Sequence, residues 1–121
     1  MSVGRITMVE WTSDEAMQAA FKLYLSKQKE YFPNAQAVIN VKTGPLSMMS
    51  LAIYESFEEA EKNLVGRQKF NDTVSMFVKD TFYYEGDLHY FFQDPNAAIV
   101  AEYTEKDRQF FEAERTAEKS G

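Results

Sequence analysis

The stretch AQAVINVKTGPLSMMSLAIY, residues 35–54, decides the fold of this chain. Apolar and polar side chains alternate on either side of Gly44-Pro45, a dipeptide typical of turns. Residues Ala35 to Thr43 and Leu46 to Tyr54 are therefore predicted to be two strands of an antiparallel hairpin. In the second strand large apolar side chains occupy both alternating sets of positions. The sequence thus predicts a sheet that is apolar on both faces.

Upstream of the hairpin, the sequence predicts a strand followed by a helix. Residues Arg5 to Trp11 read as the strand, with apolar groups on both sides. Thr12 and Glu15 have the spacing of a capping box, and Ser13 is an alternative cap. The helix carries an apolar stripe and ends at Pro33-Asn34, because the residue before a proline avoids the α region. The members of that stripe are Met17, Ala20, Phe21, Tyr24 and Leu25.

Downstream of the hairpin, a second helical region and a last strand are predicted. Ser56 and Glu59 have capping-box spacing, and the apolar pattern that follows is interrupted at Gly66. We expect either a helix that breaks or kinks near Gly66 or two helices in series. The aromatic run from Thr81 to Gln93 reads as the last strand, with a bulge near Gly86-Asp87.

This order of elements is the β-α-β-β-α-β pattern of a ferredoxin-like α+β fold. Right-handed crossovers place both helices on one face of a four-stranded antiparallel sheet. The other face of such a sheet is ordinarily polar. Here it is apolar, and a second copy of the same sheet is the simplest cover, so we expect a homodimer.

The chain divides into a predicted core at residues 1–94 and a C-terminal extension at 95–121. Thr104 has the position of a helix cap, with Asp107 three residues on, and Phe110 and Phe111 are the only large apolar residues of the charged segment that follows. A helix this polar is weak alone, so we expect it to dock on the core or on the partner subunit.

The composition excludes several classes of function. The net charge is −6, with 19 acidic against 13 basic residues, which disfavours nucleic acid as a partner. The absence of cysteine excludes disulfides and thiolate sites. No stretch approaches the roughly 20 apolar residues of a membrane span, and no leader pattern is visible, so we expect a cytoplasmic protein.

The pattern resembles the dimeric α+β barrel superfamily, which includes antibiotic-biosynthesis-monooxygenase-like, muconolactone-isomerase-like and stress-responsive barrel domains. The resemblance covers roughly residues 5–93. It rests on the order of elements, the opening strand ITMVEW (6–11), the acidic helix start SFEEA (56–60) and the aromatic segment LHYFF (88–92). It implies two ferredoxin-like sheets facing one another in a barrel. Members include monooxygenases and isomerases, so the likeness leaves the activity open.

Few residues stand out as candidates for chemistry. His89 is the only histidine and is the candidate general acid or base, although a structural role is the more common one for a lone histidine. No second histidine or tight carboxylate cluster accompanies it, so we expect no metal site. No phosphate-binding loop or nucleophile–base pair is present, and we expect no cofactor.

The interior is instead rich in methionine and aromatic side chains, which adapt to flexible apolar guests but also fill ordinary cores. The leading hypothesis is a small-molecule protein that binds an aliphatic chain or planar aromatic between sheet and helices. A cofactor-independent monooxygenase or isomerase, and a structural or protein-binding dimer without ligand, are the alternatives. The expected ligand-binding residues are Met8, Trp11, Phe21, Leu51, Arg67, Phe77, His89 and Tyr90.

Overall fold

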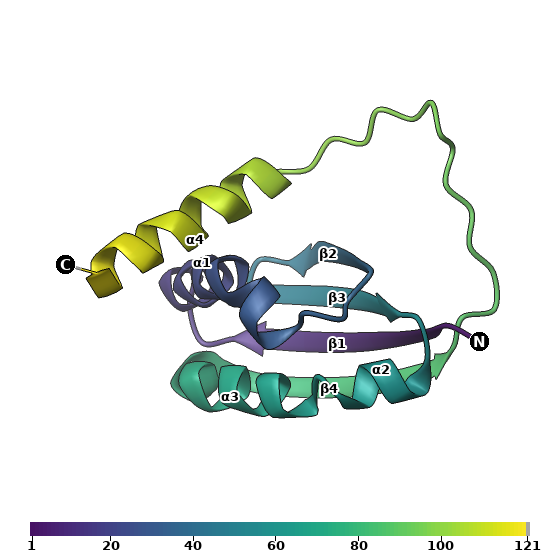
Figure 1. The fold of residues 1–121 in the computed structure, drawn as a ribbon. Helices are drawn as coiled ribbons and strands as arrows, with labels where there is room; N and C mark the ends of the chain where they lie inside the picture. The colour runs from purple at the N-terminus through teal and green to yellow at the C-terminus, as the bar shows by residue number, and fades with distance from the viewer. Residues whose placement is uncertain (121) are drawn as a thin grey trace.

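The computed structural model describes residues 1–120 and confirms the ferredoxin-like α+β fold, with the helices α1, α2 and α3 on one face of a four-stranded antiparallel sheet (Figure 1). The strand order is β2-β3-β1-β4. Along the chain the elements are β1 (Val3–Trp11), α1 (Asp14–Tyr31), β2 (Ala37–Gly44), β3 (Ser47–Tyr54), α2 (Phe57–Glu61), α3 (Leu64–Val74), the short helix η1 (Ser75–Phe77), β4 (Val78–Asp87) and α4 (Glu105–Ser120).

The helix starts follow the local sequence. The Ser13 side chain, rather than that of Thr12, accepts a hydrogen bond from the Ala16 backbone N–H at 3.1 Å and caps α1. The Ser56 side chain caps α2 in the same way, accepting from the backbone N–H of Glu59 at 3.2 Å. Each bond satisfies one of the backbone donors that a helix start leaves free.

The second helical region is two helices in series, α2 and α3, one of the two expected arrangements. They are separated at Lys62-Asn63, and Gly66 lies inside α3. Gly66 has a different role inside α3. A Cβ atom at this position would lie 1.9 Å from the backbone oxygen of Tyr31, at the end of α1. Glycine is therefore required here because the two helices pack too closely to admit any side chain.

The last strand is shorter than predicted, since β4 ends at Asp87 and not at Gln93. Its neighbour β1 begins at Val3, which pairs with Asp87, and the backbone N–H of Leu88 makes one more bond to Ser2. Beyond that point β4 has no partner strand. The ladder also runs unbroken through Gly86, and the irregularity lies instead between Glu10 and Trp11.

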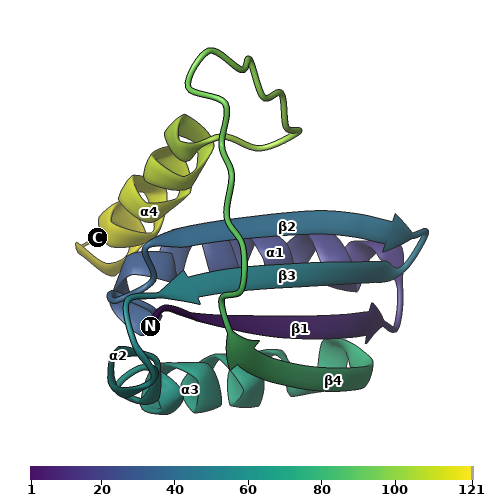
Figure 2. The same ribbon diagram turned by 90° about the vertical axis from the view of Figure 1, so that its right-hand side faces the viewer.

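The chain leaves the sheet after Asp87 as an extended arm, residues 88–104, that leads to α4. The arm passes in front of the sheet face opposite to the helices (Figure 2) and stands apart from it (Figure 1). Residues 89–101 are all exposed. The arm is therefore largely uncovered by its own chain over this length.

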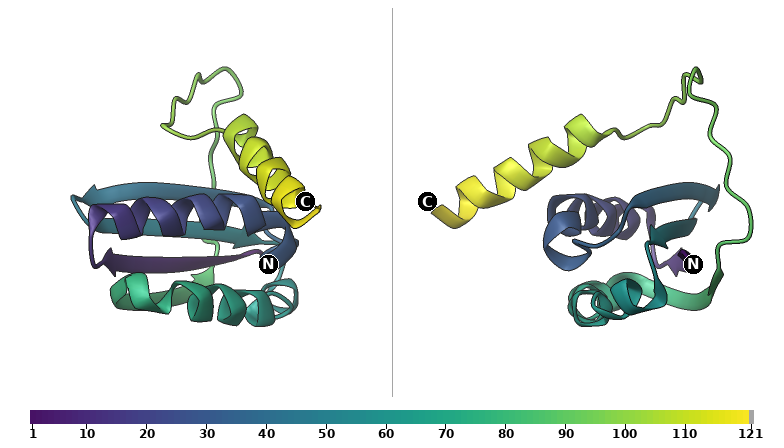
Figure 3. Two further views of the ribbon diagram at one scale, coloured as in Figure 1. Left: turned by 90° about the vertical axis from the view of Figure 1, so that its left-hand side faces the viewer. Right: turned by 45° about the vertical axis from the view of Figure 1, so that its right-hand side comes forward.

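The C-terminal helix α4 lies alongside α1 (Figure 3). Thr104 and Asp107 exchange hydrogen bonds at its start, as their spacing predicts. Two ion pairs join the helices: Arg115 to Glu30 at 3.0 Å, and Lys22 to Glu114 at 3.7 Å. None of the helices in the described part of the chain is long and apolar enough to cross a membrane.

Candidate functional site

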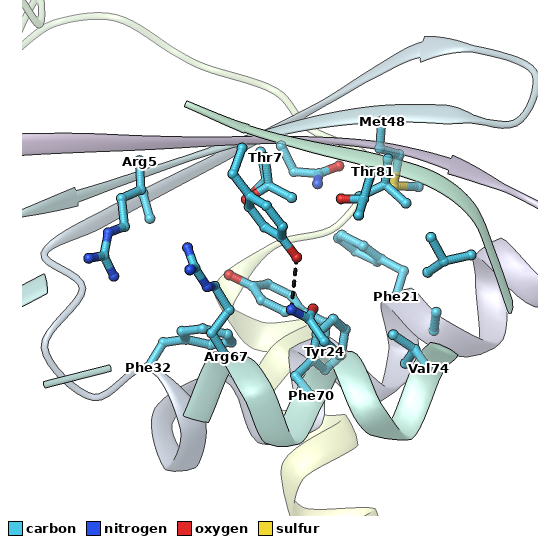
Figure 4. Close-up of a pocket in the computed structure, with 18 of the residues that line it drawn as sticks. Arg5, Thr7, Phe21, Tyr24, Phe32, Met48, Arg67, Phe70, Val74 and Thr81 are labelled. Carbon is cyan, nitrogen blue, oxygen red and sulfur yellow. Dashed lines mark hydrogen bonds between the residues drawn. The ribbon is translucent and has the colours of Figure 1, made fainter. Parts of the chain in front are cut away.

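The candidate site is a cavity of about 410 Å³ between the sheet and the helices α1 and α3 (Figure 4). From β1, the alternate residues Arg5, Thr7, Val9 and Trp11 line it, because successive side chains of a strand point to opposite faces. Cavities that hold small molecules have volumes of roughly 300–1,000 Å³. The space is thus of the right size for a small organic ligand.

One end of the pocket is apolar. Trp11 and Val74 belong to the buried core cluster, and Met48, Phe70 and Val78 pack against it while lining the cavity. Aromatic rings also pack edge to face here. The ring centroids of Tyr24 and Phe70 are 5.6 Å apart, and their planes meet at 72°. Such walls favour a flat or aliphatic guest.

The other end of the pocket holds Arg5, whose charge is compensated. Its guanidinium donates to Glu61 at 2.6 Å, to the side chain of Glu85, and to the backbone oxygen of Ala60 at 2.8 Å. Arg5 is only 8% exposed, so these bonds offset the cost of removing its charge from water. The same hydrogen bonds connect β1 to α2 and β4.

A second arginine, Arg67 of α3, lies at the same end of the pocket (Figure 4). Its guanidinium carbon is 4.6 Å from the ring centroid of Tyr83 on β4, a cation–π contact. The Tyr83 hydroxyl in turn accepts a hydrogen bond of 2.8 Å from the amide of Asn71. This chain of contacts holds both Arg67 and Tyr83 in place across the gap between α3 and β4.

Tyr24 of α1 brings a phenol to the pocket. Burial, and secondarily the nearby Tyr54, raise the pKa of Tyr24 above its ordinary value. The phenol is therefore protonated at neutral pH. It can donate a hydrogen bond to a ligand, and it is a poor general base.

Several buried polar atoms of the pocket lack a hydrogen-bond partner in the described part of the chain. These are Nε1 of Trp11, both amide atoms of Asn63 and Oγ1 of Thr81. Asn63 is 2% exposed, and all three residues line the cavity. Buried polar groups are normally satisfied, so these atoms are available to a ligand or to water.

The residues that the sequence suggested do not all meet at this pocket. Trp11, Phe21 and Arg67 line it. Met8 and Leu51 lie on the opposite face of the sheet, where Leu51 borders Gly4.

The remaining candidates also lie outside the lining. Phe77 packs against the core cluster without lining the cavity. His89 and Tyr90 lie on the exposed arm, away from the pocket. Among the described residues, no group of three histidine, aspartate or glutamate side chains is placed to hold a metal ion.

Sequence reasoning missed Arg5 and Asn63 as pocket residues. The signal for Arg5 was its alternation with Thr7 and Val9, a charged residue in phase with the apolar side of a central strand. Asn63 carried no local signal, because its burial depends on the break between α2 and α3.

The structure resembles solved proteins of the antibiotic-biosynthesis-monooxygenase-like, ferredoxin-like group. A putative antibiotic biosynthesis monooxygenase from Chloroflexus aurantiacus matches with a TM-score of 0.62 and 12% identity, covering 77% of this chain and 98% of that one. A dimeric ferredoxin-like protein from an uncultured marine organism matches with a TM-score of 0.61 and 13% identity, covering 77% of this chain and 92% of that one.

A third structure is a mutant of SnoaB, a cofactor-independent oxygenase from Streptomyces nogalater. It matches with a TM-score of 0.61 and 9% identity, covering 77% of this chain and 98% of that one. The sequence matches no known family model and no curated protein significantly. The likeness confirms the ferredoxin-like fold expected from the sequence. At these identities it establishes the fold alone.

Proposed function

We propose that this chain is a homodimeric protein that binds a small apolar molecule, an aliphatic chain or a planar aromatic, between its sheet and helices. The cavity of about 410 Å³ carries the proposal. Aromatic and aliphatic side chains wall one end of it, and polar atoms without partners lie among them. That combination provides affinity through burial of apolar area and orientation through a few polar contacts.

The homodimer is supported by the open face of the sheet, the face away from the helices. Two apolar rows cross all four strands there. One row is Ile39, Leu51, Ile6 and Tyr84, and the other is Val41, Met49, Met8 and Phe82. Ile39 is 48% exposed and Phe82 55%. A continuous apolar surface of this extent is rare on a monomer, and a second copy would bury it.

The arm supports the same assembly. Tyr90 and Phe92 are 78% and 71% exposed, and Ile99 and Val100 are also exposed on it. The arm passes in front of the open face (Figure 2). A second sheet seated on that face would lie beneath the arm, whose apolar side chains would then be covered. We therefore assign the segment beyond residue 94 to the dimer as well as to the contact of α4 with α1.

Ligand binding is tested by filling the pocket. Ser50 lies on β3 and lines the cavity at mid-strand. Ser50→Phe would place a ring in that space, and we expect it to weaken binding of decanoate and of 2-naphthoate about tenfold or more, because a ligand and the new ring cannot share the volume. Calorimetric titration and the fluorescence of Trp11, the only tryptophan, measure the affinities.

Ser50→Ala is the matched control, since it removes the hydroxyl and leaves the space open. Its affinities are expected to stay within about twofold of the unmodified protein. The melting temperatures of both variants verify folding. An unmodified protein that binds no aliphatic or aromatic compound at micromolar concentrations would refute the proposed function and favour a dimer that binds no ligand.

A cofactor-independent oxygenase or isomerase is the second candidate, favoured by the fold likeness to SnoaB. In this case the substrate would lose a proton to a pocket group and stabilise the carbanion itself. Asp72 is the carboxylate among the lining residues, and it is exposed and accepts a hydrogen bond of 2.8 Å from the amide of Gln68. His89 is remote, and the raised pKa of Tyr24 keeps that phenol protonated. Oxygen uptake with anthrone, an aromatic ketone with an acidic methylene group, distinguishes an oxygenase from a binding protein.

A further inference from the structure

The two arginines of the pocket differ in how their charges are balanced. Arg5 is bound by two carboxylates and a backbone oxygen. Arg67 has no carboxylate within ion-pair distance anywhere in the part of the chain that the structure describes. Its contact is the face of the Tyr83 ring. A half-buried guanidinium without an anion leaves its N–H donors to water or to a ligand.

The position of Arg67 is fixed before any ligand arrives. The guanidinium lies on the Tyr83 ring, and the amide of Asn71 holds the Tyr83 hydroxyl at 2.8 Å. Stacking on a ring occupies the face of a guanidinium and leaves the N–H groups at its edge free for bidentate bonding to an oxyanion. In Figure 4 the Arg67 side chain extends from α3 toward the sheet, at the end of the pocket near Arg5.

A second polar side chain that lacks a partner in the described chain lies one helical turn from Arg67. Asn63 precedes Arg67 by one helical turn, and its backbone oxygen accepts a hydrogen bond of 2.9 Å from the backbone N–H of Arg67. Its side-chain amide is buried, lines the pocket and has no hydrogen-bond partner in the described chain. An amide and a guanidinium that line the same pocket can both donate hydrogen bonds to an oxygen-rich group.

The opposite end of the pocket is suited to the other half of a molecule. Phe21 and Val74 lie at that end in Figure 4, and Trp11 is buried in the adjoining core cluster. The pocket is therefore divided into a cationic end and an apolar end.

We propose that the ligand is an amphipathic monoacid, with its carboxylate bound by Arg67 and Asn63 and its apolar body between Trp11 and Phe21. This inference rests on the proposed function and specifies the ligand class. Charged hydrogen bonds at a partly desolvated site discriminate strongly against a neutral analogue of the same shape, by about tenfold or more in affinity.

The test compares two probes of one shape, 2-naphthoate and 2-naphthamide, by calorimetric titration of the full chain. We expect the unmodified protein to bind the acid at least about tenfold more tightly than the amide. Arg67→Gln should reduce the affinity for the acid to that for the amide and leave the amide unchanged. Arg67→Lys, which keeps the charge, should retain part of the preference.

Lys69→Gln is the matched control, because it removes one positive charge from the exposed side of the same helix, outside the pocket. It should change neither affinity. Equal affinities of the unmodified protein for the acid and the amide would refute the anion site. So would an equal loss of affinity for both probes in Arg67→Gln at an unchanged melting temperature. Either result would still be compatible with an apolar pocket. Failure of both probes to bind the unmodified protein would refute the proposed function itself.

Discussion

Replacement of Gly66 by alanine is expected to lower the free energy of unfolding by about 3 kcal/mol, as overpacking against backbone does in a rigid core. The added Cβ would lie 1.9 Å from the Tyr31 backbone oxygen, so α3 and the end of α1 must move apart. The intrinsic preference of helices for alanine, about 1 kcal/mol over glycine, offsets only part of this cost. Denaturant unfolding monitored by circular dichroism measures the change.

Gly86→Ala is the control for this substitution. Gly86 lies on the edge strand β4, and a Cβ there meets nothing within 4 Å. The free energy of unfolding of Gly86→Ala should remain within about 0.5–1 kcal/mol of that of the unmodified protein. If Gly66→Ala were as stable as Gly86→Ala, the close approach of α1 and α3 would be wrong, and with it the shape of the pocket that those helices cover.

Ile39→Glu is expected to dissociate the proposed dimer, raising its dissociation constant by about 1,000-fold or more, because each subunit would place an unpaired carboxylate in an apolar interface. Ile39 lies on the open face of β2 and is 48% exposed in the single chain. The folded monomer therefore tolerates the charge. Sedimentation equilibrium over a range of concentrations measures the constant.

The neighbouring substitution Asn40→Glu is the matched control. Asn40 is also exposed on β2, but it lines the pocket side of the sheet. It adds the same charge to the opposite face and should leave the dimer intact. A dimer equally stable in both variants would show that the two apolar rows are not its interface.

Much of the fold was predictable because local signals agreed with the global pattern. The alternation around Gly44-Pro45 predicted the hairpin, and the structure pairs Ile39 with Leu51 and Val41 with Met49 in that hairpin. The same alternation places Met48 toward the helices and Met49 on the open face. Period-two patterns carry this information directly, because a residue's neighbours along the strand fix its face.

The parts that sequence reasoning mispredicted depend on contacts with distant segments. The aromatic run after Asp87 has the composition of a strand, yet it has no partner, since β1 begins at Val3. Gly66 read as a helix breaker, yet its glycine is required by the backbone of Tyr31, 35 residues earlier. Neither fact is encoded in the local pattern of side chains.

The site was less predictable than the fold for the same reason. Trp11, Phe21 and Arg67 were identifiable as large or charged residues on the helices and first strand. The pairing of Arg5 with Glu61 and Glu85 arises only when α2, β1 and β4 assemble. Arg67 of α3 has no such pair among the described residues. Which arginine is free to bind an anion is thus a property of the tertiary structure.

Native mass spectrometry of the purified, unmodified protein measures the dimer and any bound small molecule in one experiment. We expect a dimer at twice the 14.0 kDa mass of the chain, with up to one small organic molecule retained per subunit and lost on gentle activation. A monomer at micromolar concentration would contradict the dimer. A dimer that neither retains a small molecule nor gains one when decanoate or 2-naphthoate is added would contradict the ligand pocket.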